Sequence, residues 1–214
     1  MSDSSAETHP AGARSPETYP AEPWDLHGHA YVGVWLVPRD RLPAPHSSAT
    51  RPITVFGRGI VSAAFFVYEE PSPLTYNEIM STVLVREGWR PRVSITHIWV
   101  DSPASRDGGR ALWAIPKNLA EFDAVPHFSY AARGIGSLSV GRVRRLPWRL
   151  PLAFRIAQDR EGSLLVSPVR GRIRPGLAAG RWSFTDDGPL GFLAGRLPLL
   201  TLAVRPFRLI FGSR

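Results

Sequence analysis

The sequence predicts a mainly β fold (α+β), in which curved antiparallel sheets form a barrel or cone with one or two short helices. Many short apolar runs are separated by Pro, Gly and Asp, a pattern typical of strands joined by tight turns. Only two stretches have a helical period. The chain of 214 residues is long enough for one domain with a sizeable core. Closing such a sheet on itself would remove exposed strand edges.

The elements are expected in the following order. Residues 1–23 are rich in Ser, Ala, Glu, Thr and Pro and contain almost no large aliphatic residues, which predicts a disordered tail. A single domain over residues 24–214 then begins at Trp24 and Leu26. Within it, strands are predicted near residues 30–37, 52–58, 60–69, 74–86, 92–100, 124–132, 135–144, 152–158, 163–173, 179–185 and 201–211.

Two segments are candidates for helices. Residues 105–115 could begin at Ser105 as N-cap and turn Arg110 and Trp113 toward the interior. Residues 190–200 form a weaker candidate, because Pro198 interrupts them.

Composition restricts the class of protein. The absence of cysteine excludes disulfides and thiolate chemistry and suits a reducing cytoplasm, where we expect this chain. No signal peptide is recognisable, and the most apolar segment, residues 190–211, is broken by Arg and Pro, which argues against a membrane span. The net charge of +8 comes with none of the motifs of nucleic-acid-binding folds, so the arginine clusters are interpreted as solvated or subunit-contacting strand faces.

Lys117 is the single lysine among twenty-six basic residues. It follows Pro116 in an apolar run that also holds Leu112, Trp113 and Ile115. Burial in such surroundings disfavours the ammonium form and lowers the pKa, so the side chain becomes a nucleophile toward carbonyl carbons. The alternative is that arginine-rich usage reflects genome composition and that one lysine survives by chance.

The residues around Lys117 resemble the signature of the acetoacetate decarboxylase family. Gly109-Arg110 is followed by Trp113, Pro116 and Lys117, where the family has a Gly-Arg opening and a Schiff-base lysine after a proline. The resemblance covers residues 74–122 well and extends more loosely from about residue 27. It implies a β-cone or double-sheet architecture, a lysine inside the cavity, and assembly into homo-oligomers.

Upstream, Tyr76-Asn77-Glu78 resembles the family's Tyr-x-Glu, which supplies an active-site carboxylate. Alternate residues of a strand point to one face, so Tyr76 and Glu78 should point together. If that face lines the cavity, Glu78 is a carboxylate beside an amine, a pair suited to acid–base catalysis. Otherwise Glu78 is an exposed strand residue.

The sequence departs from the family at two positions that bear on substrate. Asn118 stands where the decarboxylases have a second lysine, which leaves desolvation alone to lower the pKa of Lys117. His29, in His27-Gly28-His29-Ala30-Tyr31, stands where an arginine meets the substrate carboxylate. Arg110 could meet a carboxylate as well, or pair with a nearby acid. A metal site at His27 and His29 is not expected, because no third ligand has a suitable spacing.

The sequence therefore predicts an acetoacetate-decarboxylase-like lyase that uses Lys117 as Schiff-base nucleophile and Glu78 as acid–base on a small β-keto acid or related carbonyl compound. His29, Tyr76, Arg110, Trp113 and Asn118 are the expected substrate-binding residues. No cofactor or metal is expected, because the lysine supplies the electrophile. The alternatives are a Schiff-base aldolase or dehydratase of the same superfamily, and a non-catalytic protein that binds a hydrophobic ligand.

Overall fold

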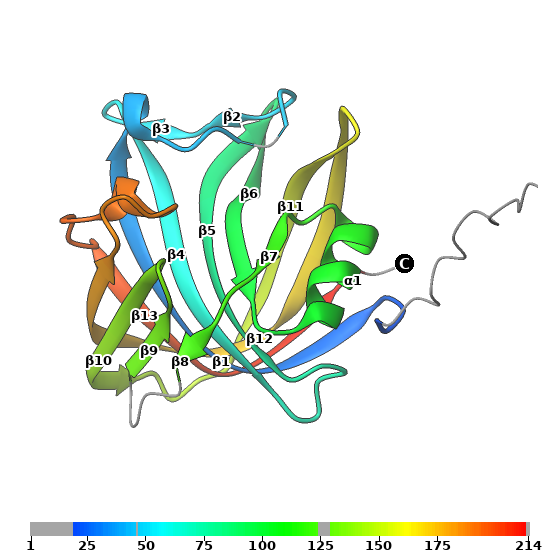
Figure 1. The fold of residues 1–214 in the computed structure, drawn as a ribbon, viewed down its shortest axis with the longest axis vertical. Helices are drawn as coiled ribbons and strands as arrows, with labels where there is room; N and C mark the ends of the chain where they lie inside the picture. Colours follow the sequence, from blue (N-terminus) through cyan, green and yellow to red (C-terminus); the bar gives the residue numbers. More distant parts are fainter. Residues whose placement is uncertain (1–18, 46, 124–128, 213–214) are drawn as a thin grey trace, which may run out of the picture.

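The computed structural model describes residues 19–45, 47–123 and 129–212, and these residues form one strongly curved sheet of thirteen strands (Figure 1). The strands are β1 (Trp24–Pro38), β2 (Arg51–Pro52), β3 (Thr54–Val55), β4 (Arg58–Glu69), β5 (Tyr76–Glu87), β6 (Arg90–Val100), β7 (Lys117–Leu119), β8 (Phe122–Asp123), β9 (Ser129–Ala132), β10 (Gly136–Arg145), β11 (Leu150–Arg160), β12 (Ser163–Phe184) and β13 (Leu200–Phe211). The helical segments are α1 (Pro103–Trp113) and the short 3₁₀ turns η1 (Arg39–Arg41) and η2 (Gly191–Leu193).

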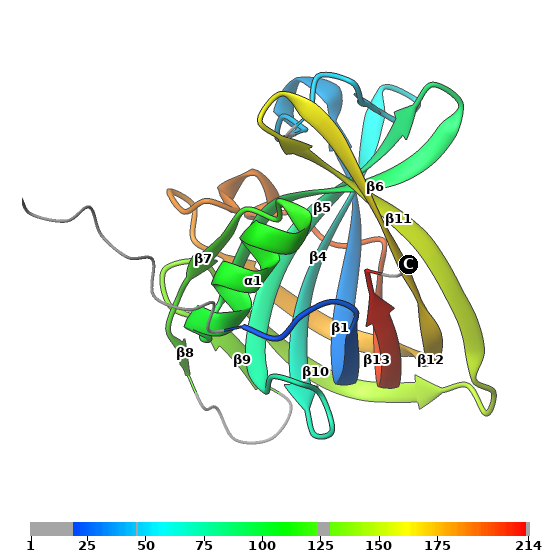
Figure 2. The ribbon, with the colours of Figure 1, turned by 90° about the vertical axis from the view of Figure 1, so that its right-hand side faces the viewer.

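Seven of the strands form a ring of hydrogen-bonded neighbours. The order is β11-β6-β5-β4-β1-β13-β12, and β12 pairs back with β11 (Figures 1 and 2). The far end of β12 leaves the ring and continues the sheet through β10, β9 and β8. Most pairs are antiparallel, while β6 pairs in parallel with both β7 and β11. The predicted mainly β fold of curved sheets is confirmed.

The two faces of the ring strands bury two separate cores. One face carries Trp24, Leu26, Ala30, Tyr76 and Ile98 and encloses the space inside the ring. The other face packs against η2 and the extension of β9, β10 and β12, through residues such as Tyr31, Trp35, Val61, Phe65, Ile79, Leu138 and Phe184. Successive residues of a strand point to opposite faces. A shift of one residue therefore moves a side chain from one core to the other.

Several element boundaries differ from the prediction. The strands predicted at 163–173 and 179–185 are one continuous strand, β12. Residues 52–58 do not form one strand: Pro52 ends β2, Thr54–Val55 form β3, and Phe56 and Gly57, both with positive φ, turn the chain into β4. Residues 190–200 form only the turn η2, and Pro198 follows it. Of the strand predicted at 124–132, residues 124–128 lie outside the described part and 129–132 are β9.

The helix α1 begins one turn earlier than predicted. Ser102, not Ser105, is the N-cap, and its hydroxyl accepts a hydrogen bond from the backbone N–H of Ser105. Pro103 occupies the first turn, where its missing N–H costs nothing. At the other end, Ala114 adopts the left-handed conformation that ends the helix. This early start places Ser105 inside the helix, with its side chain free to face the ring.

The predicted N-terminal tail falls largely outside the described residues, since 1–18 are not described. Its last five residues are described, and three of them contact the domain. Tyr19 packs against the inner core. Pro20 accepts a hydrogen bond from the indole of Trp24, and Glu22 accepts one from the indole of Trp113. The division into a tail and a domain beginning at residue 24 stays a prediction.

Candidate active site

Lys117 lies at the start of β7, directly after α1 and Pro116, and its side chain points into the ring. It pairs with Ile98 of β6 in a parallel register and is 4% exposed. Its ammonium Nζ donates to Glu78 Oε2 at 2.9 Å, to Ser105 Oγ at 2.9 Å and to Tyr76 Oη at 3.3 Å. Three oxygens therefore satisfy the three donors of an ammonium group.

The segment before Lys117 is built to admit its side chain. A Cβ added at Gly109 would lie 2.8 Å from Cδ and 2.9 Å from Cε of Lys117, so the lysine stem passes across this glycine. The Arg110 side chain fixes the backbone beyond the helix, because its Nε donates to the carbonyl of Lys117 at 2.6 Å. The Gly-Arg pair that resembled the family motif thus has a local reason: one residue makes room for the lysine and the next holds its main chain.

Glu78 is positioned by β5 and by a neighbouring tyrosine. Tyr76, Glu78 and Met80 alternate along β5, and all three line the inner cavity, as their shared parity predicted. The hydroxyl of Tyr68 on β4 donates to Glu78 Oε1 at 2.9 Å. The Tyr68 ring also stacks on Tyr76, with centroids 4.3 Å apart. One carboxylate oxygen therefore meets a tyrosine and the other meets the lysine.

The charge of the pair governs the protonation of Lys117. Burial alone lowers the pKa of this amine, but the adjacent Glu78 carboxylate and Tyr76 outweigh it, and the pKa is raised above 10.5. The prediction that desolvation leaves the pKa below its ordinary value is therefore corrected. Its premise was an apolar pocket, whereas the structure places a buried carboxylate against the amine. Burial also raises the pKa values of Tyr68 and Tyr76, so both phenols stay neutral.

Lys117 and Glu78 line a small cavity inside the ring, with a volume of about 60 Å³. Apart from this pair the lining is apolar or uncharged; it comprises Trp24, Leu26, Phe66, Tyr68, Tyr76, Met80, Thr82, Val93, Ile95, Ile98, Trp113, Ile115, Phe154, Ile156, Val169, Leu209 and Phe211. Trp113, predicted to contact substrate, is among them. No arginine lines this cavity within the described residues.

Arg110 and Asn118 lie outside the cavity. They line an open cleft on the far side of Ile115, and the guanidinium Nη2 of Arg110 donates to Asn118 Oδ1 at 2.8 Å. Asn118 is exposed, as expected for the residue after Lys117 on a strand. Neither side chain is placed to contact a molecule bound to Lys117 in this conformation.

His29 points away from Lys117, to the opposite face of the sheet. In the register of β1 with β4, Ala30 pairs with Phe66 of the inner cavity, whereas His29 pairs with Val67. The imidazole contacts Glu69 through Nδ1 at 2.9 Å and Tyr130 through Nε2 at 3.0 Å. The predicted contact of His29 with a substrate carboxylate beside the lysine does not fit this geometry. His29 and Ala30 are neighbours on β1, and neighbouring strand residues point to opposite faces of the sheet.

Two members of the site were not predicted from the sequence. Ser105 was interpreted as an N-cap, yet it is fully buried and contacts the amine. Tyr68 holds the carboxylate from the neighbouring strand, and it pairs with Tyr76 in the antiparallel register. The spacing of β4 and β5 around the turn at Glu70 could have indicated this pair, since a short hairpin fixes which residues stand opposite each other.

Residues 50–146 match the family model for acetoacetate decarboxylase, a stretch that contains Tyr76, Glu78 and Lys117. The resemblance predicted from the sequence is confirmed. The chain has the acetoacetate decarboxylase fold. No match was found among curated proteins.

Solved structures with the acetoacetate decarboxylase fold cover almost the whole chain. Acetoacetate decarboxylase from Legionella pneumophila has a TM-score of 0.67 at 17% identity and covers 100% of this chain and 97% of its own. The enduracididine biosynthesis enzyme MppR, complexed with the condensation product of pyruvate and imidazole 4-carboxaldehyde, has a TM-score of 0.60 at 16% identity, covering 98% and 97%. An acetoacetate decarboxylase-like enzyme from Sphingomonas wittichii has a TM-score of 0.59 at 17% identity, covering 94% and 97%.

In the described part of the chain, no group of three or more His, Cys, Asp or Glu side chains is placed to hold a metal ion. Within the same residues, no helix is long and apolar enough to cross a membrane.

Proposed function

We propose that this protein is an enzyme that forms a Schiff base between Lys117 and the carbonyl group of a small substrate, as an acetoacetate-decarboxylase-like lyase. The observation that carries the proposal is the single lysine of the chain, buried inside the ring with a carboxylate 2.9 Å from its amine. The family match over residues 50–146 supports it.

The chemistry follows from the nucleophile. Neutral Lys117 attacks the carbonyl carbon, and loss of water gives a protonated imine. In a β-keto acid, the bond to the carboxylate then breaks, its electron pair moves into an enamine, and carbon dioxide leaves. The enamine carbon takes a proton, and water hydrolyses the resulting imine to release the ketone and the free amine. The lysine supplies the electrophile itself, so this cycle needs no cofactor.

Glu78 is proposed to supply the proton transfers. Lys117 carries a proton in the resting pair, because its pKa is raised by the carboxylate. Transfer of that proton across 2.9 Å to Glu78 gives a neutral amine and a neutral acid without changing the charge of the cavity. The acid can then protonate the departing hydroxyl of the carbinolamine, and after taking up another proton from water it can protonate the enamine carbon. Tyr68 and Ser105 would hold the two groups in line throughout.

One observation favours a second reaction of the same intermediate. A β-keto acid brings a carboxylate next to the reacting carbonyl, yet no arginine lines the cavity among the described residues. An enamine on Lys117 can instead add to an aldehyde, or the imine can lose water, as in aldolases and dehydratases. The complex of MppR with a pyruvate condensation product shows that a protein of this fold accommodates such a product.

The experiment that separates these reactions is product analysis. The protein is incubated with acetoacetate, and separately with pyruvate and an aldehyde, and products are identified by NMR and by carbon dioxide release. Decarboxylation predicts acetone and carbon dioxide, and the alternative predicts condensation or dehydration products. Either activity should be lost in Lys117→Arg. A protein that only binds a hydrophobic ligand would bind without turnover and would bind equally well in that variant.

Two further expectations remain proposals. Assembly into a homo-oligomer is supported by large apolar side chains that are exposed, such as Phe56 at 98%, Trp89 at 96% and Trp148 at 65%. Light scattering of the purified protein would give its mass. A cytoplasmic location is supported by the absence of cysteine from the sequence.

A further inference from the structure

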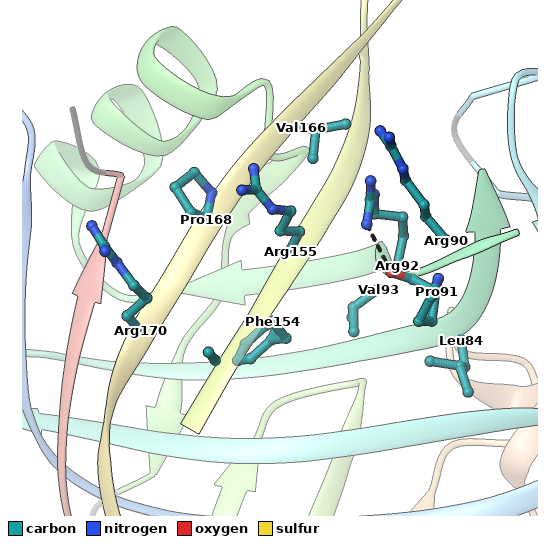
Figure 3. Close-up of a pocket in the computed structure, with 11 residues that line it drawn as sticks. Leu84, Arg90, Pro91, Arg92, Val93, Phe154, Arg155, Val166, Pro168 and Arg170 are labelled. Atoms are coloured by element: carbon teal, nitrogen blue, oxygen red, sulfur yellow. Dashed lines mark hydrogen bonds between the residues drawn. The ribbon is translucent and has the colours of Figure 1, made fainter. Parts of the chain in front are cut away.

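A cleft on the outside of the ring is lined by four arginines. It lies where β6, β11 and β12 meet and holds about 800 Å³, a volume typical of ligand sites (Figure 3). Arg90 and Arg92 come from β6, Arg155 from β11 and Arg170 from β12. Arg92 is paired with Glu87 at 2.8 Å. Within the described residues, Arg90, Arg155 and Arg170 form no ion pair with an acid, so their charges are uncompensated.

This cleft shares a wall with the lysine cavity. Val93 and Phe154 line both spaces, one from β6 and the other from β11. Figure 3 shows both side chains beside the arginines. Only these two residues, which contribute no charged group, are common to the two linings among the described residues. A molecule that passed between them would go from the arginines directly into the apolar interior of the ring.

The seam between β6 and β11 is weak at this point. The two strands are joined in the described residues by one parallel pair, Val93 with Ile156. On the Lys117 side of that pair, Gln158 seals the seam, because its side chain donates to the carbonyl of Ile95 and accepts from the Ile95 N–H, both at 3.0 Å. On the other side, no bridge of this kind between described residues holds Phe154 against β6. Rotation of the half-buried Phe154 would therefore open the cavity toward the cleft.

The other cleft beside the cavity is less suited to an anion. It shares Ile115 with the cavity, but its arginines are engaged. Arg110 donates to Lys117 O and to Asn118, and Arg160 donates to the carbonyls at the end of α1. Asp159 and Glu161 add negative charge there.

From these contacts we propose that the arginine-lined cleft binds the anionic end of an elongated substrate whose carbonyl reaches Lys117. The substrate class is a carbonyl compound with an apolar segment between its reactive carbonyl and a terminal carboxylate or phosphate. Val93 lies five positions before Ile98, the partner of Lys117, which is a separation of roughly 17 Å along β6 at about 3.3 Å per residue. This assignment rests on the proposed Schiff base, and it explains how a cavity without an arginine can serve an anionic substrate.

The test compares methyl-ketone carboxylic acids of increasing chain length with their neutral methyl esters, as substrates for reductive trapping on Lys117. In wild type, the concentration that gives half-maximal trapping should be lowest for acids long enough to span this distance. For the corresponding esters it should be at least about tenfold higher. Arg155→Ala and Arg170→Ala should remove that preference, while Arg155→Lys keeps part of it. Arg181→Ala, an exposed arginine of β12 outside the cleft, is the matched control. Equal half-saturation for acid and ester in wild type would overturn the proposal.

A second measurement keeps this proposal separate from the Schiff base. Binding of dodecanoate and dodecyl phosphate below their micelle-forming concentrations, and of methyl dodecanoate below its solubility limit, is measured by calorimetry on Lys117→Arg, which cannot form the imine. The two anions should bind at least about tenfold more tightly than the ester, and Arg155→Ala should abolish the difference. If the anions bind no better than the ester, the cleft is not an anion site, whatever the trapping shows. If they bind as expected but no carbonyl is trapped, the proposed reaction fails and the cleft assignment stands.

Discussion

Glu78 Oε2 lies 2.9 Å from Nζ of Lys117, and the two side chains are only 3% and 5% exposed. Removing one partner of a buried ion pair strongly destabilises the fold, because the other charge is left unpaired in an apolar site. The same proximity lets a proton move between them without creating net charge. A substitution at Glu78 should therefore change both the stability of the ring interior and the reactivity of Lys117.

Glu78→Gln should separate imine formation from turnover. Without the carboxylate, burial becomes the dominant influence and the pKa of Lys117 falls, so reductive trapping should reach its maximum at lower pH than in wild type. Turnover should drop by about 10²- to 10⁴-fold, because the amide cannot transfer protons. The free energy of unfolding should fall by about 3–5 kcal/mol. Glu121→Gln, at an exposed acid paired with Arg133, is the control. Unchanged turnover in Glu78→Gln would contradict the acid–base role proposed for Glu78.

Gly109→Ala should reduce the reactivity of Lys117 while the fold survives. The new methyl group would lie 2.8 Å from Cδ of the lysine and must push its flexible stem aside, which moves Nζ away from Glu78. The neighbouring Gly108→Ala provides a matched control, because its methyl group meets the Trp24 ring at 2.6 Å instead. Trapping rates and thermal unfolding of both variants give the comparison. Loss of stability is expected in Gly108→Ala, and loss of trapping in Gly109→Ala; the reverse pattern would contradict the placement of the lysine stem.

Trp113→Ala should shift the pH dependence of Lys117 toward alkaline pH. The indole packs against Trp24 and Phe211 and shields the cavity, so its removal admits water and weakens the desolvation that opposes protonation. The pKa should rise, and trapping at a given pH should fall. The substitution should also cost about 3–5 kcal/mol of stability. Trp182→Ala, in the second core, should cost stability without moving the pH profile. An equal shift in both variants would show that the effect is a general loosening.

His29→Ala should leave trapping of Lys117 unchanged, because the imidazole lies on the other face of the sheet. Its effect should appear in stability at acid pH. Burial, partly opposed by Glu69, lowers the pKa of His29 below 6.5 in the folded state. A lowered folded pKa means that the contribution is present above about pH 6.5 and is lost as the pH falls toward the folded value. Denaturant unfolding at pH 7.5 and 5.5 should show a smaller difference in His29→Ala than in wild type. A loss of trapping in this variant would show that His29 takes part in the active site.

The local pattern was sufficient to predict parts of the site, whereas a carboxylate at Glu78 beside Lys117 was implied by the family resemblance. The parity of β5 places Tyr76 and Glu78 on one face, and the apolar run before Lys117 predicts its burial; both follow from periodicity alone. His29 was misplaced because strand parity is meaningful only relative to a register, and the register of β1 with β4 cannot be derived from one sequence. The raised pKa of Lys117 was missed for a related reason: the distance to Glu78 depends on how β5, β6 and β7 pair.

Contacts between residues that are distant in the sequence could not be predicted from it. Ser105 reaches the amine only because α1 begins at Ser102, whereas Ser105 itself was predicted to be the N-cap. The arginines of the outer cleft come from β6, β11 and β12, and their meeting depends on the closure of the ring between β11 and β6. The arginine clusters were interpreted as solvated or subunit-contacting strand faces, and the convergence of Arg90, Arg155 and Arg170 at one cleft was not predicted.

Lys117 should form a covalent imine with a carbonyl substrate, and reductive trapping with mass mapping detects that bond. The protein is incubated with acetoacetate, pyruvate or an aldehyde in the presence of borohydride, digested, and the modified peptide is sequenced by mass spectrometry. Because Lys117 is the only side-chain amine in the sequence, the adduct can otherwise fall only on the N-terminus. The account predicts a single adduct on Lys117 that is absent from Lys117→Arg. Turnover by Lys117→Arg equal to wild type, or an adduct confined to the N-terminus, would contradict it.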